Sequence, residues 1–392
     1  MRLARRALLL GAGALACSPA NAAGDAFQSF LQSLWPQAQN ANVSRATFER
    51  AFASLTPDPR LMGSGIQQAE FERTIEQYIN SAVSDGRAAK GRALMQRWSN
   101  ELHVIEQRIG VPASIILATW GLETDFGSAH GDRDVVRSLA TLAYTRKDNQ
   151  SFVKEVIAAL VMLERGLVTR DKFKGSWAGA MGHPQFMPSA YLKHGLSYAG
   201  SAAPDIWASV PDALASIANF LMHEGWQRTL PWGCEVDVPN AFDWTRLNGT
   251  VRDFTTKSVT PMQAIQPSAQ VSLFAPAGAQ GPAVFITANF FVLKQYNNSD
   301  SYALALSLLS ERIAGRPALK HAWPKPFTIL PREDRVKVQQ LLAQHKFYEG
   351  KIDGRFGPSS RLAIHQFQRA AGLHPADGFA SRTVLQALIA YR

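Results

Sequence analysis

Residues 112–127 read PASIILATWGLETDFG, and this stretch decides the kind of fold that the chain can adopt. Proline is favoured in the first turn of a helix, and the residues that follow Pro112, from Ala113 to Glu123, are almost all apolar. A helix that is apolar on every side has to be buried. The sequence therefore predicts a helix over 113–123 in the interior of a helical domain.

Helical patterns continue on both sides of this stretch. The apolar spacing is helical from about residue 27 to residue 110, and Glu70–Val83 has one apolar stripe with charged residues opposite. Further helices are predicted over residues 135–144, 152–165, 210–223 and 301–313. Runs rich in β-forming residues, separated by Gly and Pro, lie between the last two of these helices, at 234–238, 271–274, 283–287 and 291–293. The predicted fold is mainly α (α+β), with a small β-rich insertion at about 232–294 in a helical domain.

The C-terminal part of the chain is predicted to be a separate small domain. Residues 315–331 contain four prolines and little periodicity, which indicates an interdomain linker over 315–329. Amphipathic helices are predicted beyond it, over 335–345, 360–370 and 381–390. Asp-Gly pairs at 353–354 and 377–378 mark the turns between these helices.

The first 22 residues have the pattern of a secretory signal peptide. Three arginines precede an apolar run, and Ala20-Asn21-Ala22 forms a small-x-small cleavage site. The Arg5-Arg6 pair leaves twin-arginine export open. Cys17 offers the alternative of a lipid anchor in the outer membrane, but the residues before it match a lipobox poorly. We favour cleavage after Ala22 and expect the mature protein in the periplasm.

The composition limits the partners that this chain can have. A length of 392 residues allows two or three domains, and 46% hydrophobic with 18% charged residues excludes wholesale disorder. The net charge is +10, of which +7 remains once a leader with three arginines and no acids is removed. These charges are scattered, which together with export argues against nucleic acid as a partner. No other apolar run reaches 18 residues, so we expect no transmembrane segment, and we expect a monomer.

Metal and cofactor chemistry has no support in the sequence. The two cysteines, Cys17 and Cys234, are too few for a disulfide framework or a four-cysteine zinc site. The nine histidines include no HExxH pattern, and no GxGxxG or P-loop motif is present. We therefore predict no cofactor and no metal.

One carboxylate is a candidate for catalysis. Glu123 ends the most apolar predicted helix, and burial beside apolar groups raises the pKa of a carboxyl group because it disfavours the charged form. A carboxylic acid that is neutral at pH 7 can act as a general acid. The alternative is a solvated glutamate at the end of a helix, and the local sequence favours neither.

Two other segments carry polar side chains among aromatic ones. Residues 174–189 read KGSWAGAMGHPQFMPS, in which Ser176 and Gln185 suit sugar binding, although a tightly packed corner is the simpler interpretation of this segment taken alone. Residues 295–302 read QYNNSDSY after a predicted strand. This segment is typical of a turn with a helix cap, and its two tyrosines could equally line a cleft.

Taken together, in this order and spacing, the segments resemble the membrane-bound lytic murein transglycosylase B family over nearly the full mature length. The residues that carry the resemblance are GLET at 121–124, GSWAGAMG at 175–182, QFMPS at 185–189 and YNNS at 296–299. The C-terminal domain resembles the three-helix peptidoglycan-binding module through VQQLL at 338–342, DGRFG at 353–357 and HQFQ at 365–368. Together with the leader and linker patterns, the resemblance gives a signal peptide at 1–22, a catalytic domain at 23–314, a linker at 315–329 and a binding domain at 330–392.

The resemblance implies a lysozyme-like core that acts on the glycan strands of peptidoglycan. It would cleave the β-1,4 bond between N-acetylmuramic acid (MurNAc) and N-acetylglucosamine (GlcNAc) and form 1,6-anhydro-MurNAc ends without consuming water. Glu123 would act first as acid and then as base. Further side chains would bind the substrate or line the cleft: Ser176, Gln185, Tyr296, Asn297, Tyr302 and Tyr78. Asp125 should point about 200° away from Glu123 if the helix continues, which is the wrong side for a second catalytic carboxylate.

The chain departs from the family pattern at two places. Some members carry a calcium loop, but the matching stretch here, residues 197–207, keeps only Asp205 as a carboxylate. Because calcium takes six to eight oxygen ligands, we predict no calcium site. Phe220 stands where the family often has tyrosine. Two other functions remain as alternatives: a muramidase that uses water, and a non-catalytic wall-binding protein.

Overall fold

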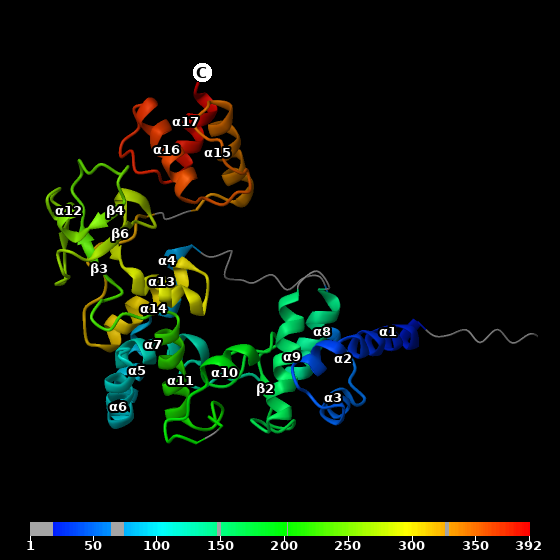
Figure 1. The fold of residues 1–392 in the computed structure, drawn as a ribbon. Helices are drawn as coiled ribbons and strands as arrows, with labels where there is room; N and C mark the ends of the chain where they lie inside the picture. The colour runs from blue at the N-terminus through cyan, green and yellow to red at the C-terminus, as the bar shows by residue number, and fades with distance from the viewer. Residues whose placement is uncertain (1–18, 64–73, 147–149, 202, 326–328) are drawn as a thin grey trace, which may run out of the picture. The chain divides into compact units, whose positions relative to one another are not determined.

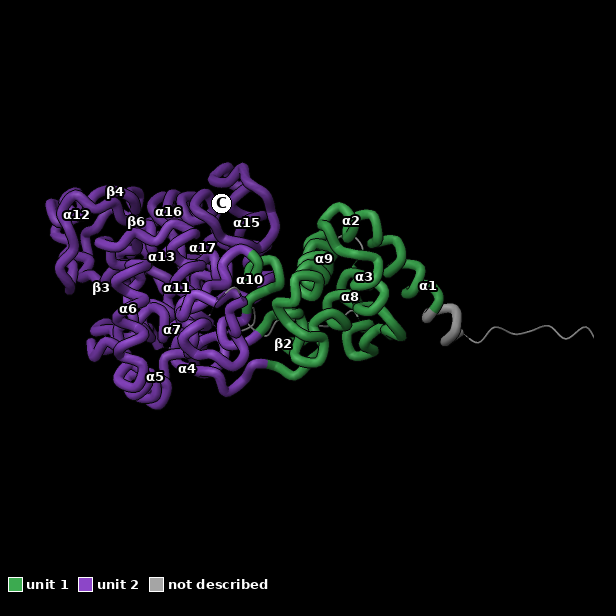
Figure 2. Tube along the Cα trace, turned by 60° about the horizontal axis from the view of Figure 1, so that its bottom comes forward, with its two compact units in different colours: residues 1–66, 131–181, 186–192 green, residues 67–130, 182–185, 193–392 purple. Residues whose placement is uncertain are grey.

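The computed structural model describes residues 19–63, 74–146, 150–201, 203–325 and 329–392 (Figure 1). They form two compact units (Figure 2). Unit 1 comprises residues 1–66, 131–181 and 186–192, and unit 2 comprises residues 67–130, 182–185 and 193–392. Most of the predicted leader, residues 1–18, lies outside the described residues. No helix in the described ranges is long and apolar enough to cross a membrane.

Unit 1 is helical, with one short hairpin. Its elements are α1 (Pro19–Ser33), α2 (Trp35–Asn40), α3 (Arg45–Phe52), η1 (Pro59–Leu61), β1 (Arg133–Asp134), α8 (Val135–Thr145), α9 (Gln150–Glu164), β2 (Lys174–Gly175) and the start of α10 (Pro188–His194). Helices α8 and α9 pack side by side, and buried Leu139 and Leu160 lie in their apolar faces. Strands β1 and β2 pair antiparallel, with Arg133 opposite Gly175.

Seven helices in the described part of unit 2 lie outside the β-rich insertion and the C-terminal bundle. They are α4 (Ile75–Ala82), α5 (Asp85–Arg97), α6 (Ser99–Ile109), α7 (Ala113–Thr124), α11 (Val210–His223), α13 (Ala288–Tyr296) and α14 (Asp300–Ile313). Helix α7 packs against α14, α5, α11 and α6, and Ile116, Leu117 and Ala118 have no exposed surface. The predicted buried helix is therefore confirmed, and it ends one residue later than expected.

The chain reverses direction at the end of α7. Asp125, Phe126 and Gly127 have φ angles of 47°, 58° and 83°, so the helix cannot continue. The turn brings the buried Phe126 ring back over Gly121, where a Cβ atom would lie 2.7 Å from Phe126 Cζ. The ring itself packs edge-on against Trp120, with a centroid distance of 5.7 Å. Position 121 therefore has room only for glycine.

Replacing Gly121 with alanine is expected to destabilise the protein by about 1–3 kcal/mol, although alanine is normally the better helix former. The reason is that a Cβ at position 121 would overlap the buried ring of Phe126, which packs against Trp120. Thermal unfolding measures the effect. Gly86→Ala in the first turn of α5 is the control, because a Cβ there meets nothing within 4 Å and should be neutral or stabilising. Equal melting temperatures for the two variants would contradict the prediction.

The β-rich insertion forms an antiparallel sheet in the order β4-β6-β7-β3-β5. The strands are β3 (Gly233–Asp237), β4 (Asn248–Thr250), β5 (Thr260–Pro261), β6 (Gln270–Phe274) and β7 (Ala283–Ile286), and the insertion also holds α12 (Val251–Thr255) and η3 (Gly278–Gln280). The prediction of a β run at 291–293 is wrong, because these residues lie within α13. Thr287 Oγ1 accepts a hydrogen bond from Asn289 N and caps that helix, so the chain turns helical directly after β7.

The predicted helix over Glu70–Val83 is corrected at its start. Thr74 and Gln77 form a capping box, in which each side chain accepts a hydrogen bond from the backbone N–H of the other residue. The helix α4 therefore begins at Ile75. Residues 70–73 lie outside the described residues.

The C-terminal helices form a small bundle with its own core. Helices α15 (Arg332–Gln344), α16 (Pro358–Ala370) and α17 (Arg382–Ala390) occupy the orange to red part of Figure 1. Their core includes Val338, Leu342, Ile364, Phe367 and Leu388. Each predicted Asp-Gly turn is fastened by a glutamine: Gln339 Oε1 accepts from Gly354 N, and Gln368 Oε1 accepts from Gly378 N. The three predicted helices are confirmed within a few residues at their ends.

Candidate active site

The half-buried Glu123 lies in the last turn of α7, where it meets the side chain of Tyr302. The Tyr302 hydroxyl donates a hydrogen bond of 2.5 Å to Glu123 Oε1. Tyr302 lies in the first turn of α14 and is only 4% exposed, and Ser299 Oγ caps this helix by accepting from Tyr302 N. Because α7 and α14 pack together, the fold brings two predicted site residues into direct contact although 179 positions separate them.

The hydrogen bond and the surroundings act on Glu123 in opposite directions. Burial, with the nearby charge of Glu123 next, raises the pKa of Tyr302 well above its ordinary value, so the phenol keeps its proton at physiological pH. A donated hydrogen bond stabilises an ionised carboxylate, whereas burial favours the neutral acid. The site thus combines a half-buried carboxyl group with a hydrogen-bond donor on Oε1.

Tyr296 and Asn297 lie at the end of α13. The Tyr296 hydroxyl donates to the carbonyl oxygen of Pro184 at 2.8 Å, which connects α13 to the short segment 182–185. Burial, and secondarily the charge of Glu123, raises the pKa of Tyr296 well above its ordinary value. Asn297 follows the helix in an extended conformation, with φ −147° and ψ 119°. The ring of Phe220 on α11 packs edge-on against Tyr296, with a centroid distance of 4.8 Å.

The remaining predicted site residues have different surroundings. Gln185 has a φ of 51°, and its amide nitrogen donates to the carbonyl oxygens of Gly182 (2.9 Å) and His130 (3.2 Å). Tyr78 is half-buried on α4, which packs against α14. Ser176 belongs to unit 1, where its Oγ accepts from Ala180 N at 3.1 Å in the tight turn after β2.

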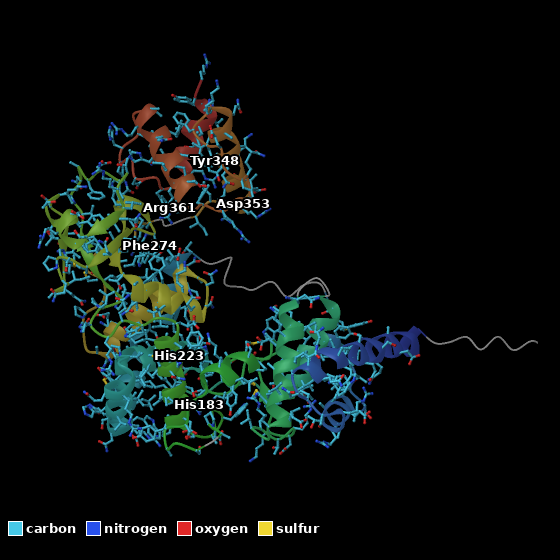
Figure 3. All side chains as sticks on the ribbon, in the orientation of Figure 1. His183, His223, Phe274, Tyr348, Asp353 and Arg361 are labelled. Atoms are coloured by element: carbon cyan, nitrogen blue, oxygen red, sulfur yellow. The ribbon has the colours of Figure 1, made fainter. Side chains whose placement is uncertain are left out.

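A histidine that the sequence analysis did not single out supports the last turn of α7. This residue, His183, is labelled in Figure 3. Its Nδ1 accepts a hydrogen bond of 2.9 Å from Trp120 Nε1 and lies 3.1 Å from His130 Nε2. Its carbonyl oxygen accepts from Thr124 Oγ1 at 3.1 Å. Burial, and secondarily the charge of His130, lowers the pKa of His183 to about 4, so the ring is neutral at pH 7. His183 therefore joins the segment that holds Gln185 to the helix that holds Glu123.

Asp125, the nearest carboxylate to Glu123 in the sequence, is engaged elsewhere. Its carboxylate pairs with Arg87 (Nε, 3.3 Å) and Lys90 (Nζ, 3.0 Å) on α5, and Lys90 also donates to the Asp125 carbonyl oxygen. Burial alone would raise the pKa of Asp125, but the hydrogen bonds from Lys90 and Arg87 bring it below its usual value. Asp125 therefore fastens the end of α7 to α5.

The loop at 197–207, for which the sequence predicted no calcium site, is held together by the carboxylate of Asp212. Asp212 accepts from the backbone N–H groups of Tyr198 (2.8 Å) and Asp205 (2.9 Å). Asp205 in turn accepts from the N–H groups of Trp207 and Ala208. Across the residues that the structure describes, no three His, Cys, Asp or Glu side chains gather as they would around a metal ion.

Comparison with known families identifies the domain that contains these residues. Residues 26–311 match the model of the transglycosylase SLT domain. The chain belongs to the SLT transglycosylase family. Residues 331–388 of the same chain match the model of a putative peptidoglycan-binding domain, so an SLT domain precedes a binding module. The predicted family resemblance and the mainly helical fold are both confirmed.

Relatives of this SLT protein include solved structures. SltB3 from Pseudomonas aeruginosa, crystallised with NAG-anhNAM-pentapeptide, is 35% identical, with a TM-score of 0.86 over 93% of this chain and 99% of that one. Its complex with NAG-NAM-pentapeptide gives a TM-score of 0.85, over 92% of this chain and 99% of that one. The membrane-bound lytic murein transglycosylase B of Escherichia coli K12 is 26% identical over 244 residues, which is 60% of this chain and 66% of that protein. The chain thus spans about two thirds of the length of that curated relative.

Proposed function

We propose that this protein is a lytic transglycosylase, which cleaves the β-1,4 bond between MurNAc and GlcNAc in peptidoglycan and forms 1,6-anhydro-MurNAc ends. The observation that carries the proposal is a single half-buried carboxyl group, Glu123, that receives a hydrogen bond from Tyr302. Similarity to SltB3, whose structures contain NAG-anhNAM-pentapeptide and NAG-NAM-pentapeptide, supports the same class of substrate.

The reaction needs only one protein carboxyl group. Neutral Glu123 gives its proton to the glycosidic oxygen while the bond between that oxygen and C1 of MurNAc breaks, and the acetamido group of the substrate stabilises the cation. The resulting carboxylate accepts the proton of the C6 hydroxyl of the same sugar, whose oxygen bonds to C1 and closes the anhydro ring. Glu123 ends protonated, and no water is consumed. Tyr302 donates a hydrogen bond to Oε1 of this carboxyl group.

The other predicted site residues are proposed to hold the sugar chain. Tyr296 and Asn297 follow each other at the end of α13, and Tyr302 begins α14 next to them. Gln185 lies in the segment 182–185. Hydrogen bonds from Tyr296 to Pro184 O and from Thr124 to His183 O hold this segment in place. We assign substrate contacts to these residues and to Ser176 and Tyr78, with Ser176 at the acetamido group.

The product decides between this function and its nearest alternative. A muramidase that uses water needs a second carboxylate or a placed water opposite Glu123, and the ion pairs of Asp125 with Arg87 and Lys90 speak against that residue in this role. Mass spectrometry of digested sacculi should find 1,6-anhydro-MurNAc ends. Reducing MurNAc ends alone would refute the proposal, and no cleavage at all would favour a non-catalytic wall-binding protein.

Replacing Tyr302 with phenylalanine should lower the turnover rate about 10-fold and move the basic limb of the pH–rate profile about one unit upward. The phenol is the donor that favours the ionised form of Glu123, so its loss makes the acid hold its proton to higher pH. The buried ring is preserved, so the fold is kept. Turnover of soluble glycan over pH 4–9 measures both effects. A slower enzyme with an unchanged pH profile would assign Tyr302 to substrate binding only.

We further propose export to the periplasm with cleavage after Ala22. Two observations support this proposal. The leader has arginines, then an apolar run, then a small-x-small site, and the proposed substrate is the cell wall, which lies outside the cytoplasm. The net charge of +7 on the mature chain favours the anionic wall, with an attraction that weakens as salt is added. The mass of the mature protein tests the cleavage site. A lipid-modified N-terminus at Cys17 would replace this proposal with outer-membrane anchoring.

A further inference from the structure

Unit 2 contains a cavity of about 640 Å³ that lies between the β-rich insertion and the C-terminal bundle. The insertion contributes residues 238–244, which follow β3, together with Ala279 and Gln280 at η3. The bundle contributes His365 and Arg369 of α16 and the loop 374–376. None of the residues assigned to the active site lines this cavity, and its volume is typical of a site for a small ligand.

The two walls of the cavity are joined by specific contacts. Within the bundle, Asp377 Oδ1 accepts from Phe379 N and Gln368 Nε2, as Asp353 Oδ1 does from Arg355 N in the first Asp-Gly turn. The second carboxylate oxygen of Asp377, Oδ2, accepts a hydrogen bond of 2.8 Å from Ala279 N of η3 in the insertion. At Gly278, φ is 70° and a Cβ atom would lie 2.4 Å from Asp377 Oδ2, so the close approach of η3 requires glycine.

A half-buried cation, Arg361, lies near the same contact. Figure 3 shows Arg361 on α16. Burial lowers the pKa of Arg361, and the charges of Asp300 and Asp377 act against that effect. Asp300 begins α14, the helix that carries Tyr302, so the bundle is close to the catalytic domain as well as to the insertion. The cavity is therefore part of a formed junction within unit 2.

The lining of the cavity combines aromatic faces with charges of both signs. Phe242 and Trp244 pack edge to face at 5.3 Å on the insertion side, with the exposed carboxylate of Asp243 between them in the sequence. The guanidinium of Arg369 is exposed on the bundle side, and no ion pair to it occurs among the described residues. His365 is 5% exposed, and its Nδ1 is buried without a hydrogen-bond partner in the described part of the chain. An unpaired polar atom in the lining is costly unless a ligand or water completes it.

We propose that this cavity binds the peptide stem of peptidoglycan, a short peptide that bears both free carboxylates and a free amine. Arg369 would pair with a carboxylate, Asp243 with the amine, and Trp244 would cover the apolar part of the peptide. Asp243 Oδ1 accepts hydrogen bonds from Thr245 N and Thr245 Oγ1. A neutral sugar chain would offer no opposite charge to Arg369 or Asp243, which is why the lining favours peptide over glycan. The inference rests on the proposed function for its substrate, and it adds a second point of attachment to the same polymer.

A second attachment has a kinetic consequence. A strand held by its peptide stem at the junction stays near Glu123 after each cleavage, since the second binding event becomes intramolecular. The enzyme should therefore remain longer on sacculi that keep free stem peptides than on glycan from which the peptides have been removed.

Binding to the full-length chain tests the proposal, in the Glu123→Gln background so that no probe is consumed. The probes are the free stem tetrapeptide containing diaminopimelate and a peptide-free GlcNAc tetrasaccharide, and isothermal titration calorimetry measures their affinities. We expect the tetrapeptide to bind, and Arg369→Gln and Asp243→Asn each to weaken it at least 10-fold. The tetrasaccharide affinity should be unchanged in both. Arg246→Gln, an exposed charge of the insertion outside the cavity, is the matched control and should bind like the parent.

Three outcomes would overturn the inference: no binding of the tetrapeptide, equal binding in Arg369→Gln and the parent, or loss of tetrasaccharide binding in place of tetrapeptide binding. Circular dichroism melts confirm that the variants fold, as expected for exposed side chains. The outcome is independent of the catalytic proposal, which the product analysis of sacculi decides. Tetrapeptide binding without anhydro products would retain the site and refute the reaction.

Discussion

The Glu123→Gln variant is expected to degrade sacculi at least about 10³-fold more slowly than the parent protein, because glutamine can neither give a proton to the glycosidic oxygen nor take one from the C6 hydroxyl. Glutamine keeps the size of the side chain and its place beside Tyr302, so the fold should be preserved. Release of soluble anhydro-muropeptides measures the rate, and a melting curve checks the fold. Full lytic activity in this variant would mean that another group is the acid.

The matched control is Asp125→Asn, two residues further along the chain. It removes a carboxylate of the same sequence motif, but one that pairs with Arg87 and Lys90 on α5. Because these side chains are partly exposed, the stability loss should stay below about 1 kcal/mol, and most of the activity should remain. A loss as large as that of Glu123→Gln would point to a two-carboxylate mechanism and favour the muramidase alternative.

The buried helix could be predicted from the sequence because its apolar residues point in all directions and leave no solvent-facing side. The β run at 291–293 could not be predicted correctly. Phe291, Val292 and Leu293 suit a strand or a helix equally, and the cap that Thr287 provides to Asn289 decides the outcome. Short apolar runs are therefore assigned by their flanking caps and their packing rather than by their own composition.

The residues of the candidate site could be predicted from the sequence, but the hydrogen bonds between them could not. Family resemblance placed Glu123 and Tyr302 in one cleft, but the hydrogen bond between them joins positions 179 apart and depends on how α7 packs against α14. The hydrogen bond from Trp120 to His183 spans 63 positions. The sequence contains one indication of this hydrogen bond. His183 lies among small residues beside Gln185, and a large polar ring that packs among small residues needs a hydrogen-bond partner.

His183 should make the protein sensitive to acid. Burial holds the pKa of the folded-state ring near 4, whereas an unfolded chain takes up the proton near 6.5. Between these values the unfolded state binds more protons, so stability rises with pH in this range. The neutral His183 ring therefore contributes about 3 kcal/mol to the free energy of unfolding above about pH 6.5. This contribution is lost as the pH falls towards 4. Protonation would also remove the acceptor that Trp120 uses, at the end of the helix that carries Glu123.

A His183→Gln variant separates this effect from general acid unfolding, because glutamine can accept from Trp120 and does not titrate. The variant is expected to be less stable than the parent at pH 7.5, since its packing is imperfect, yet to lose several degrees less in melting temperature between pH 7 and pH 4.5. His103→Gln on α6 is the control, since that ring is exposed, and its melting temperatures should follow those of the parent. Parallel curves for the His183 variant and the parent would show that the proton is taken up elsewhere, with His194 on α10 next in line because burial also lowers its pKa to about 4.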